Sequence, residues 1–209
     1  MNDTEETNRI SLEFKVLING NDIADVADVI SITAHKQFCK ISTAEVVLHY
    51  GSLLDDDFVD DKNQDMSIGN EMEIYADEGE LCVFKGVVVK KSVSLSNKKS
   101  LLTLTAKNKA YKMALNRYNH VFSEMKDSEM IEELINKYGL NCEVESTSYK
   151  NETATQYNCS DWDFVNIKAE SNALLVFTDD DKIMVKKPKA ESAKFEINGY
   201  ESIVDFDAQ

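Results

Sequence analysis

Proline and glycine are scarce in this sequence of 209 residues, which contains one proline, Pro188, and seven glycines. Ordinary globular chains hold about 5% proline and about 7% glycine. The scarcity excludes collagen-like chains and the disordered chains that are rich in these two residues. Apolar residues make up 43% of the sequence and charged residues 29%, which is ordinary globular usage, so the composition predicts a folded protein.

Long hydrophobic runs are also missing. The sequence contains no stretch of the roughly 18 apolar residues that a membrane-spanning helix requires. Its first residues are polar and acidic, without the basic and apolar parts of a secretory signal. We therefore expect synthesis in the cytoplasm without a signal peptide, and no direct insertion of this segment into a membrane.

Basic residues are outnumbered, since 23 lysines and arginines face 38 acidic residues and give a formal net charge of −15. This balance disfavours nucleic acid and anionic membrane surfaces as partners, because both bind positive charge. Residues 82–118 depart from it, with several lysines and no carboxylate. These lysines either keep the sheet edges soluble or form an interface with an acidic patch on another subunit. The candidate interface residues are Lys90, Lys91, Lys98 and Lys99.

Catalytic and metal-binding signatures are absent from the sequence. It has no nucleophile elbow, zinc-protease motif, P-loop or dinucleotide fingerprint. The four cysteines lack a C-x-x-C pair, which favours reduced thiols packed as small hydrophobes. The aspartate-rich stretch 55–65 lacks the glycine of a calcium loop, because Met66 stands at that position. The sequence thus predicts no catalytic residue, no cofactor and no metal, and it indicates that the protein is not an enzyme.

Strict alternation of apolar and polar residues predicts strands through the first half of the chain. Asn19-Gly20 follows the first strand and is the strongest short hairpin signal. Short strands at this spacing predict an antiparallel sheet that is curled into a barrel or a sandwich. The expected strands cover residues 10–18, 29–34, 41–50, 71–76, 81–94 and 100–106.

Two helices are predicted in the second half. The first is capped by Asp127 or Ser128 and ends at Gly139, which suits a left-handed helix terminus. The second opens at Ser160 and ends near Asn172. Its apolar residues fall on two sides, so we expect it to lie between two layers. Trp162 and Phe164, one on each side, are the expected structural anchors.

The sequence therefore predicts an α+β protein that is mainly β. The chain ends in strand-like sequence without a closing element, which indicates a fragment of a longer protein or a strand that a neighbouring subunit completes. A hairpin is expected over 173–187, before Pro188. The expected divisions are a flexible tail at 1–9, a first β-barrel-like domain at 10–107, an α/β segment with two helices and a hairpin at 108–190, and a strand entering a second barrel at 191–209.

The stretch from Gln156 to Thr178 resembles the hub portion of VgrG proteins, the tip proteins of type VI secretion, also known as Rhs element Vgr proteins. It is similar too to the baseplate hubs of contractile-tailed phages. The likeness rests on Tyr157, the Ser-Asp-Trp-Asp-Phe run at 160–164, Ala169-Glu170 and the strand that follows. The helix that ends in Tyr138-Gly139-Leu140 is also of the family's type. Asn172 departs from the glycine that the family usually has.

The resemblance implies a structural hub of a contractile injection apparatus. Two β-barrel domains per chain in a homotrimer would form a ring of pseudo-sixfold symmetry that adapts a hexameric, Hcp-like tube to a trimeric spike. Spike or effector domains are the implied further partners, and the protein would leave the cytoplasm with the apparatus. Two alternatives remain open: a free-standing β-rich module that binds a ligand or carbohydrate, and a hydrolase that uses Asp161 and Asp163 as its carboxylate pair.

Overall fold

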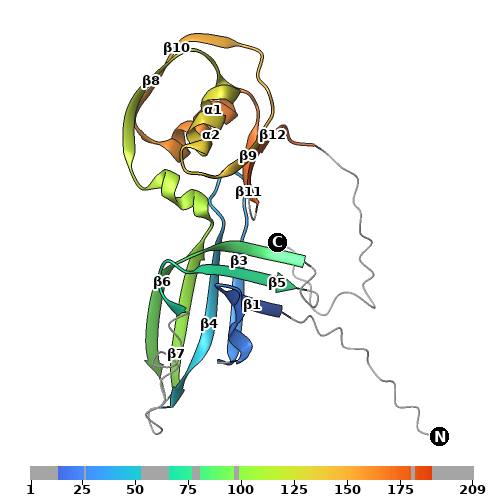
Figure 1. Ribbon diagram of the computed structural model, residues 1–209, viewed down its shortest axis with the longest axis vertical. Helices are drawn as coiled ribbons and strands as arrows, with labels where there is room; N and C mark the ends of the chain where they lie inside the picture. The colour runs from blue at the N-terminus through green and yellow to red at the C-terminus, as the bar shows by residue number, and fades with distance from the viewer. Residues whose placement is uncertain are drawn as a thin grey trace, which may run out of the picture.

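The computed structural model describes residues 14–25, 27–52, 66–76, 81–96, 99–179 and 182–189. Two lobes follow one another along the chain (Figure 1), and each has a hydrophobic core of its own. Strands dominate both lobes and most strand pairs are antiparallel, which confirms the predicted mainly β, α+β fold class. The expected tail at 1–9, the aspartate-rich stretch at 55–65 and the expected strand at 191–209 lie outside the described residues.

The first lobe is a seven-stranded antiparallel sheet in the order β2-β1-β5-β6-β7-β4-β3. Asn19 and Gly20, both at positive φ, form the two-residue turn between β1 and β2, which confirms the hairpin signal of the sequence. A short 3-10 turn, η1 (Ile23–Asp25), follows β2. The strands are β1 (Phe14–Ile18), β2 (Asn21–Asp22), β3 (Val29–His35), β4 (Thr43–Ser52), β5 (Glu71–Ala76), β6 (Leu81–Ser96) and β7 (Lys99–Lys107).

Only one face of this sheet is buried. In β5, for example, Met72, Ile74 and Ala76 are buried while the residues between them are half-buried. The core that these side chains form draws its buried residues only from positions 16 to 106, so no helix of the second lobe covers it. A sheet that buries one face without a covering layer has to curl over on itself, as Figure 1 shows.

Close packing explains the glycine in the middle of β6. A Cβ atom on Gly86 would lie 2.4 Å from the backbone oxygen of Lys107 and 2.7 Å from the ring of Phe84. Real side chains do not approach this closely, so only glycine lets β6 and β7 meet at this point. The ladder shifts register shortly afterwards, between Val88 and Lys90, where a bulge increases the bend of the strand.

The second lobe encloses two helices between two sheets. On one side β8 and β10 form an antiparallel ribbon, and on the other β9, β12 and β11 form a three-stranded sheet. The helix α1 contacts β8 and β9, and α2 contacts β10 and β11. The elements are η5 (Lys109–Ala114), β8 (Arg117–Lys126), α1 (Asp127–Asn136), β9 (Asn141–Val144), β10 (Lys150–Ser160), α2 (Asp161–Ser171), β11 (Leu175–Asp179) and β12 (Lys182–Lys186).

The ribbon was not predicted from the sequence because its apolar pattern is weak. Along β8 only Phe122 is buried, and along β10 the inward positions include Ala154 and the polar Gln156. The opposite face of the ribbon is exposed. Apolar and polar residues nevertheless do not alternate regularly along the two strands. The short strand β9 was missed as well, since it pairs in parallel with β12 from a distant part of the chain.

The helix termini differ in detail from the prediction. The cap of α1 is Lys126, one residue earlier than expected, because the Asp127 side chain binds the end of α2 instead of its own backbone. Ser160 caps α2 as predicted and accepts a hydrogen bond from the Asp163 amide at 3.0 Å. Asn172 ends α2 at a φ of −107°, so the expected left-handed residue is not Asn172 but Ala173, with a φ of 54°.

Trp162 and Phe164 both belong to the second core, and their role as structural anchors stays a prediction. Trp162 is 6% exposed and Phe164 is 4% exposed, whereas Ile167 on the same helix is 52% exposed. The Phe164 ring stacks on Phe122 with 5.4 Å between centroids and 16° between planes. This contact ties α2 to the ribbon.

We predict that Trp162→Ala lowers the free energy of unfolding by about 3–5 kcal/mol, because it empties a large volume in a packed core. Chemical denaturation of the purified chain measures the change. Ile167→Ala, on the same helix but exposed, is the matched control and should change stability by about 0.5 kcal/mol or less. Equal stability of Trp162→Ala and the parent protein would show that the indole is not an anchor.

Candidate functional site

Asp161, the first residue of α2, is completely buried and accepts three hydrogen bonds. Gln156 of β10 donates at 2.8 Å. Lys137 and Tyr138, which follow the last residue of α1, each donate at 2.7 Å. Burial alone would raise the pKa of the Asp161 carboxyl, but the three donors outweigh it and hold the pKa below its ordinary value.

Asp127, the first residue of α1, repeats this arrangement in the opposite direction. Lys168 and Asn172, at the end of α2, donate to its carboxylate at 2.9 and 2.8 Å. Asn151 of β10 donates at 3.0 Å. Here too burial alone would raise the pKa of the carboxyl. The charge and hydrogen bond of Lys168, together with the hydrogen bonds of the two amides, outweigh burial and lower the pKa.

The two helices are therefore joined at both ends. At each end, the carboxylate at the start of one helix accepts hydrogen bonds from side chains at the end of the other helix. This double clamp was not predicted from the sequence, because the residues that it joins between the helix ends lie 23 to 45 positions apart. Both oxygens of the buried Asp161 carboxylate already accept hydrogen bonds within the fold, and Asp163 is exposed rather than buried beside it. The geometry thus argues against the pair Asp161 and Asp163 as a hydrolytic site and assigns Asp161 a structural task.

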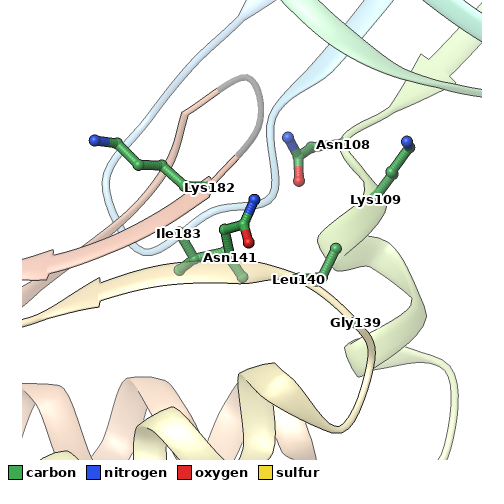
Figure 2. Close-up of a pocket in the computed structure, with 7 residues that line it drawn as sticks. All are labelled: Asn108, Lys109, Gly139, Leu140, Asn141, Lys182 and Ile183. Atoms are coloured by element: carbon green, nitrogen blue, oxygen red, sulfur yellow. The ribbon is translucent and has the colours of Figure 1, made fainter.

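A crevice separates the two lobes at their joint (Figure 2). Its volume is about 320 Å³, and its lining includes Asn108 and Lys109 from the link between the lobes and Asn141 and Lys182 from the second lobe. Figure 2 shows Lys109 and Lys182 at opposite sides of the opening, with the two asparagines between them. Lys109 pairs with Glu71 and Lys182 with Glu143, so the lysines are already neutralised.

The joint itself is held by direct hydrogen bonds. Ser42, just before β4, and Thr178 on β11 are both buried, and their hydroxyl oxygens lie 2.6 Å apart. The Thr178 hydroxyl also accepts from the Ser42 backbone amide at 3.1 Å. Asn108 adds a bond from its side-chain amide to the backbone oxygen of Asp179 at 3.4 Å. The crevice is therefore a by-product of a structural joint, without a group poised for catalysis.

The lysines of the basic stretch are placed in different surroundings. Lys85 pairs with Glu73 at 3.1 Å, and Lys109 pairs with Glu71. Both glutamates lie on β5, so these two lysines neutralise acidic residues of the first lobe. Lys90 is exposed on β6 and forms no ion pair within the described part of the chain, and Lys91 beside it is half-buried. Lys99 begins β7, and Lys98 lies outside the described residues. Their expected role as an interface stays a prediction.

Other reactive groups give no sign of chemistry. Within the described ranges, no three histidine, cysteine or acidic side chains gather in a way that would hold a metal ion. All four cysteines are free thiols, and burial raises the pKa of Cys142, which makes it less reactive. Among the residues described, no helix has the length and apolar character needed to cross a membrane.

Comparison with known proteins places this geometry among tail and secretion proteins. The family model of the Alg8 N-terminal domain matches residues 8–209. No curated protein matches the sequence. The 43 kDa tail protein of prophage MuSo2 from Shewanella oneidensis has a similar structure, with a TM-score of 0.69 and 9% identity, and the match covers 90% of this chain and 56% of that one.

Two further solved structures are also similar to this chain. One is the E. coli c3393 protein, a component of the type VI secretion system with structural similarity to the T4 tail proteins gp27 and gp5 (TM-score 0.63, 12% identity, 82% of this chain and 48% of that one). The other is the Francisella PdpA-VgrG complex, in its half-lidded form (TM-score 0.53, 11% identity, 84% and 31%). The resemblance to VgrG and phage tail hub proteins is thus confirmed in the fold. This chain spans about half the length of the MuSo2 and c3393 proteins and less of the Francisella chain.

The double clamp predicts how stability depends on pH. Both carboxyls have a folded pKa below the ordinary value of 3.8, so their contribution is present above about pH 4 and is lost as the pH falls through the lower, folded pKa. We expect Asp161→Asn to lower the free energy of unfolding at pH 7 by about 1.5–3 kcal/mol, as for hydrogen bonds to charged groups. Denaturation curves between pH 7 and about pH 2 measure both effects, and the variant should lose less stability in acid than the parent.

Asp163→Asn is the control for this experiment. It removes an exposed carboxylate from the same helix turn and should cost less than about 1 kcal/mol. If Asp161→Asn matched the parent in stability and acid profile, the clamp would not hold the helices together.

Proposed function

This chain belongs to the Alg8 N-terminal domain family, and we propose that it is a structural hub component of a contractile injection apparatus, of the phage-tail or type VI secretion kind. The observation that carries the proposal is the shared fold with the MuSo2 tail protein, which extends over both lobes because it covers 90% of the chain.

In finer detail, we propose that the complete protein assembles as a homotrimer and adapts a hexameric, Hcp-like tube to a trimeric spike. The PdpA-VgrG complex among the similar structures supports spike or effector domains as further partners. The protein would be exported together with the apparatus.

The first test concerns assembly. We predict that the protein at its natural length is a trimer, measured by light scattering over a range of concentrations, and that it binds a ring of its tube protein. A protein that stays monomeric at high concentration and binds no ring would contradict the hub. Monomeric behaviour together with binding in a glycan or small-ligand screen would favour the free-standing binding module.

The second test concerns the basic stretch. Reversal of Lys90, Lys91, Lys98 and Lys99 to glutamate should slow assembly and weaken its dependence on salt, because complementary charge acts mainly on the association rate. Charges beyond about 8 Å are screened at physiological ionic strength, so the parent should assemble more slowly as salt rises. Stopped-flow light scattering at several salt concentrations measures these rates.

The control reverses the same number of lysines elsewhere and so keeps the net charge equal. The control residues are Lys15, Lys62, Lys150 and Lys194, all of which lie outside the basic stretch in the sequence. An unchanged rate and salt dependence in the first variant, with the fold intact, would make its lysines surface solubilisers and not an interface.

A further inference from the structure

An apolar pocket lies on the outer face of the β11–β12 hairpin, away from the second core. Its volume is about 270 Å³, and its lining includes Phe38, Leu175, Phe177, Met184, Pro188 and Lys189. Phe177 and Met184 are direct cross-strand partners and so point to the same side of the hairpin. Their neighbours Val176 and Val185 point the other way, into the core. The hairpin thus carries apolar side chains on both faces, although only one face is covered.

Phe38 forms one wall of the pocket, and the fold sets its backbone position before any ligand binds. Phe38 lies in the link between β3 and β4, and the next residue, Cys39, donates its backbone amide to Val176 on β11 at 2.7 Å. Cys39 has a φ of 59°, so the backbone turns sharply beside Phe38. The Phe38 ring meets the Phe177 ring at 5.7 Å between centroids and is still 61% exposed. A binding surface that is already ordered loses little conformational entropy when a ligand arrives.

The surroundings of the pocket are basic in a chain that is strongly acidic. Its two outer segments, residues 36–42 and 182–189, contain six lysines and no carboxylate, while the whole chain has a net charge of −15. Glu143 and Glu145 of the neighbouring β9 region pair with Lys182, Lys186 and Lys187. Lys189 is exposed and forms no close ion pair within the described residues. Hydrogen bonds from Lys187 lower the pKa of Glu145, and the charge of Lys189 helps to lower it. More positive than negative charge therefore surrounds the apolar floor.

We propose that this pocket docks an extended acidic segment of a partner protein, which inserts one aromatic side chain between Phe38, Phe177 and Met184. The flanking acidic side chains of that segment face Lys189, beside Lys187, which already pairs with Glu145. Pockets for drug-sized ligands begin at about 300 Å³, so a cavity of this size suits a single large side chain. A buried aromatic anchor within a charged rim is the usual anatomy of a binding hot spot.

Lysines and aromatic rings also suit a nucleic acid, and the net charge decides between the two. A polyanion of many phosphates is repelled by a chain with a net charge of −15, whereas a short acidic peptide meets mainly the local lysines. The docking site would serve the proposed hub as an attachment point for another part of the apparatus. Its chemistry does not depend on that function, so the two proposals can fail separately.

The test is fluorescence anisotropy with the purified chain and a labelled short peptide of aspartates and glutamates around one central phenylalanine. We expect saturable binding that weakens at least tenfold when the phenylalanine of the peptide is replaced by alanine. Phe38→Ala and Lys189→Glu should each weaken binding at least fivefold, and higher salt should weaken it further. Both residues are exposed, so the variants keep the fold, which circular dichroism and thermal unfolding verify.

Matched controls are Phe14→Ala, an exposed phenylalanine of the first lobe, and Lys90→Glu, an exposed lysine of β6. Both should leave the affinity for the peptide unchanged. Equal binding of the phenylalanine and alanine peptides, equal binding by Phe38→Ala, or preferential binding of a labelled single-stranded oligonucleotide would overturn the proposal. Peptide binding by a protein that does not assemble would retain the docking site and reject the hub.

Discussion

The second lobe depends on two aspartates that sit at the first positions of two antiparallel helices and bind the ends of one another's helix. Asp161 receives Lys137 and Tyr138 from the end of α1, and Asp127 receives Lys168 and Asn172 from the end of α2. A buried carboxylate is stable only when such donors surround it. Because each clamp needs both helices, neither helix can shift without leaving a charge unpaired.

The ribbon and the joint between the lobes build on this pair of helices. The same strand, β10, supplies an amide to each carboxylate, Asn151 at one end and Gln156 at the other, so the ribbon is fixed in register with the helices. On the opposite side α2 leads into β11, whose Thr178 and Val176 hold the link before β4 through Ser42 and Cys39. The orientation of the first lobe is in this way connected to the clamp.

This chain of contacts also explains where partner surfaces are available. The inner face of the first sheet and the space around the helices are filled by the two cores. Two of the features exposed among the described residues are Lys90 on β6 and the apolar face of the β11–β12 hairpin beside Phe38. A protein that works by connecting other proteins needs surfaces of this kind, and it can leave its buried carboxylates to structural tasks.

The sequence by itself determined the local elements, because local signals suffice for them: alternation for the strands of the first lobe, Asn19-Gly20 for its turn, and Ser160 for the start of α2. Only the tertiary structure decided the pairing of β8 with β10, the parallel partner of β9 and the donors around Asp127 and Asp161. These contacts join residues that are far apart in the chain, and Gln156 or Asn151 carries no mark in the sequence that distinguishes a buried amide from a solvated one. Burial and pairing depend on the whole fold, so long-range polar contacts are decided there and not by local pattern.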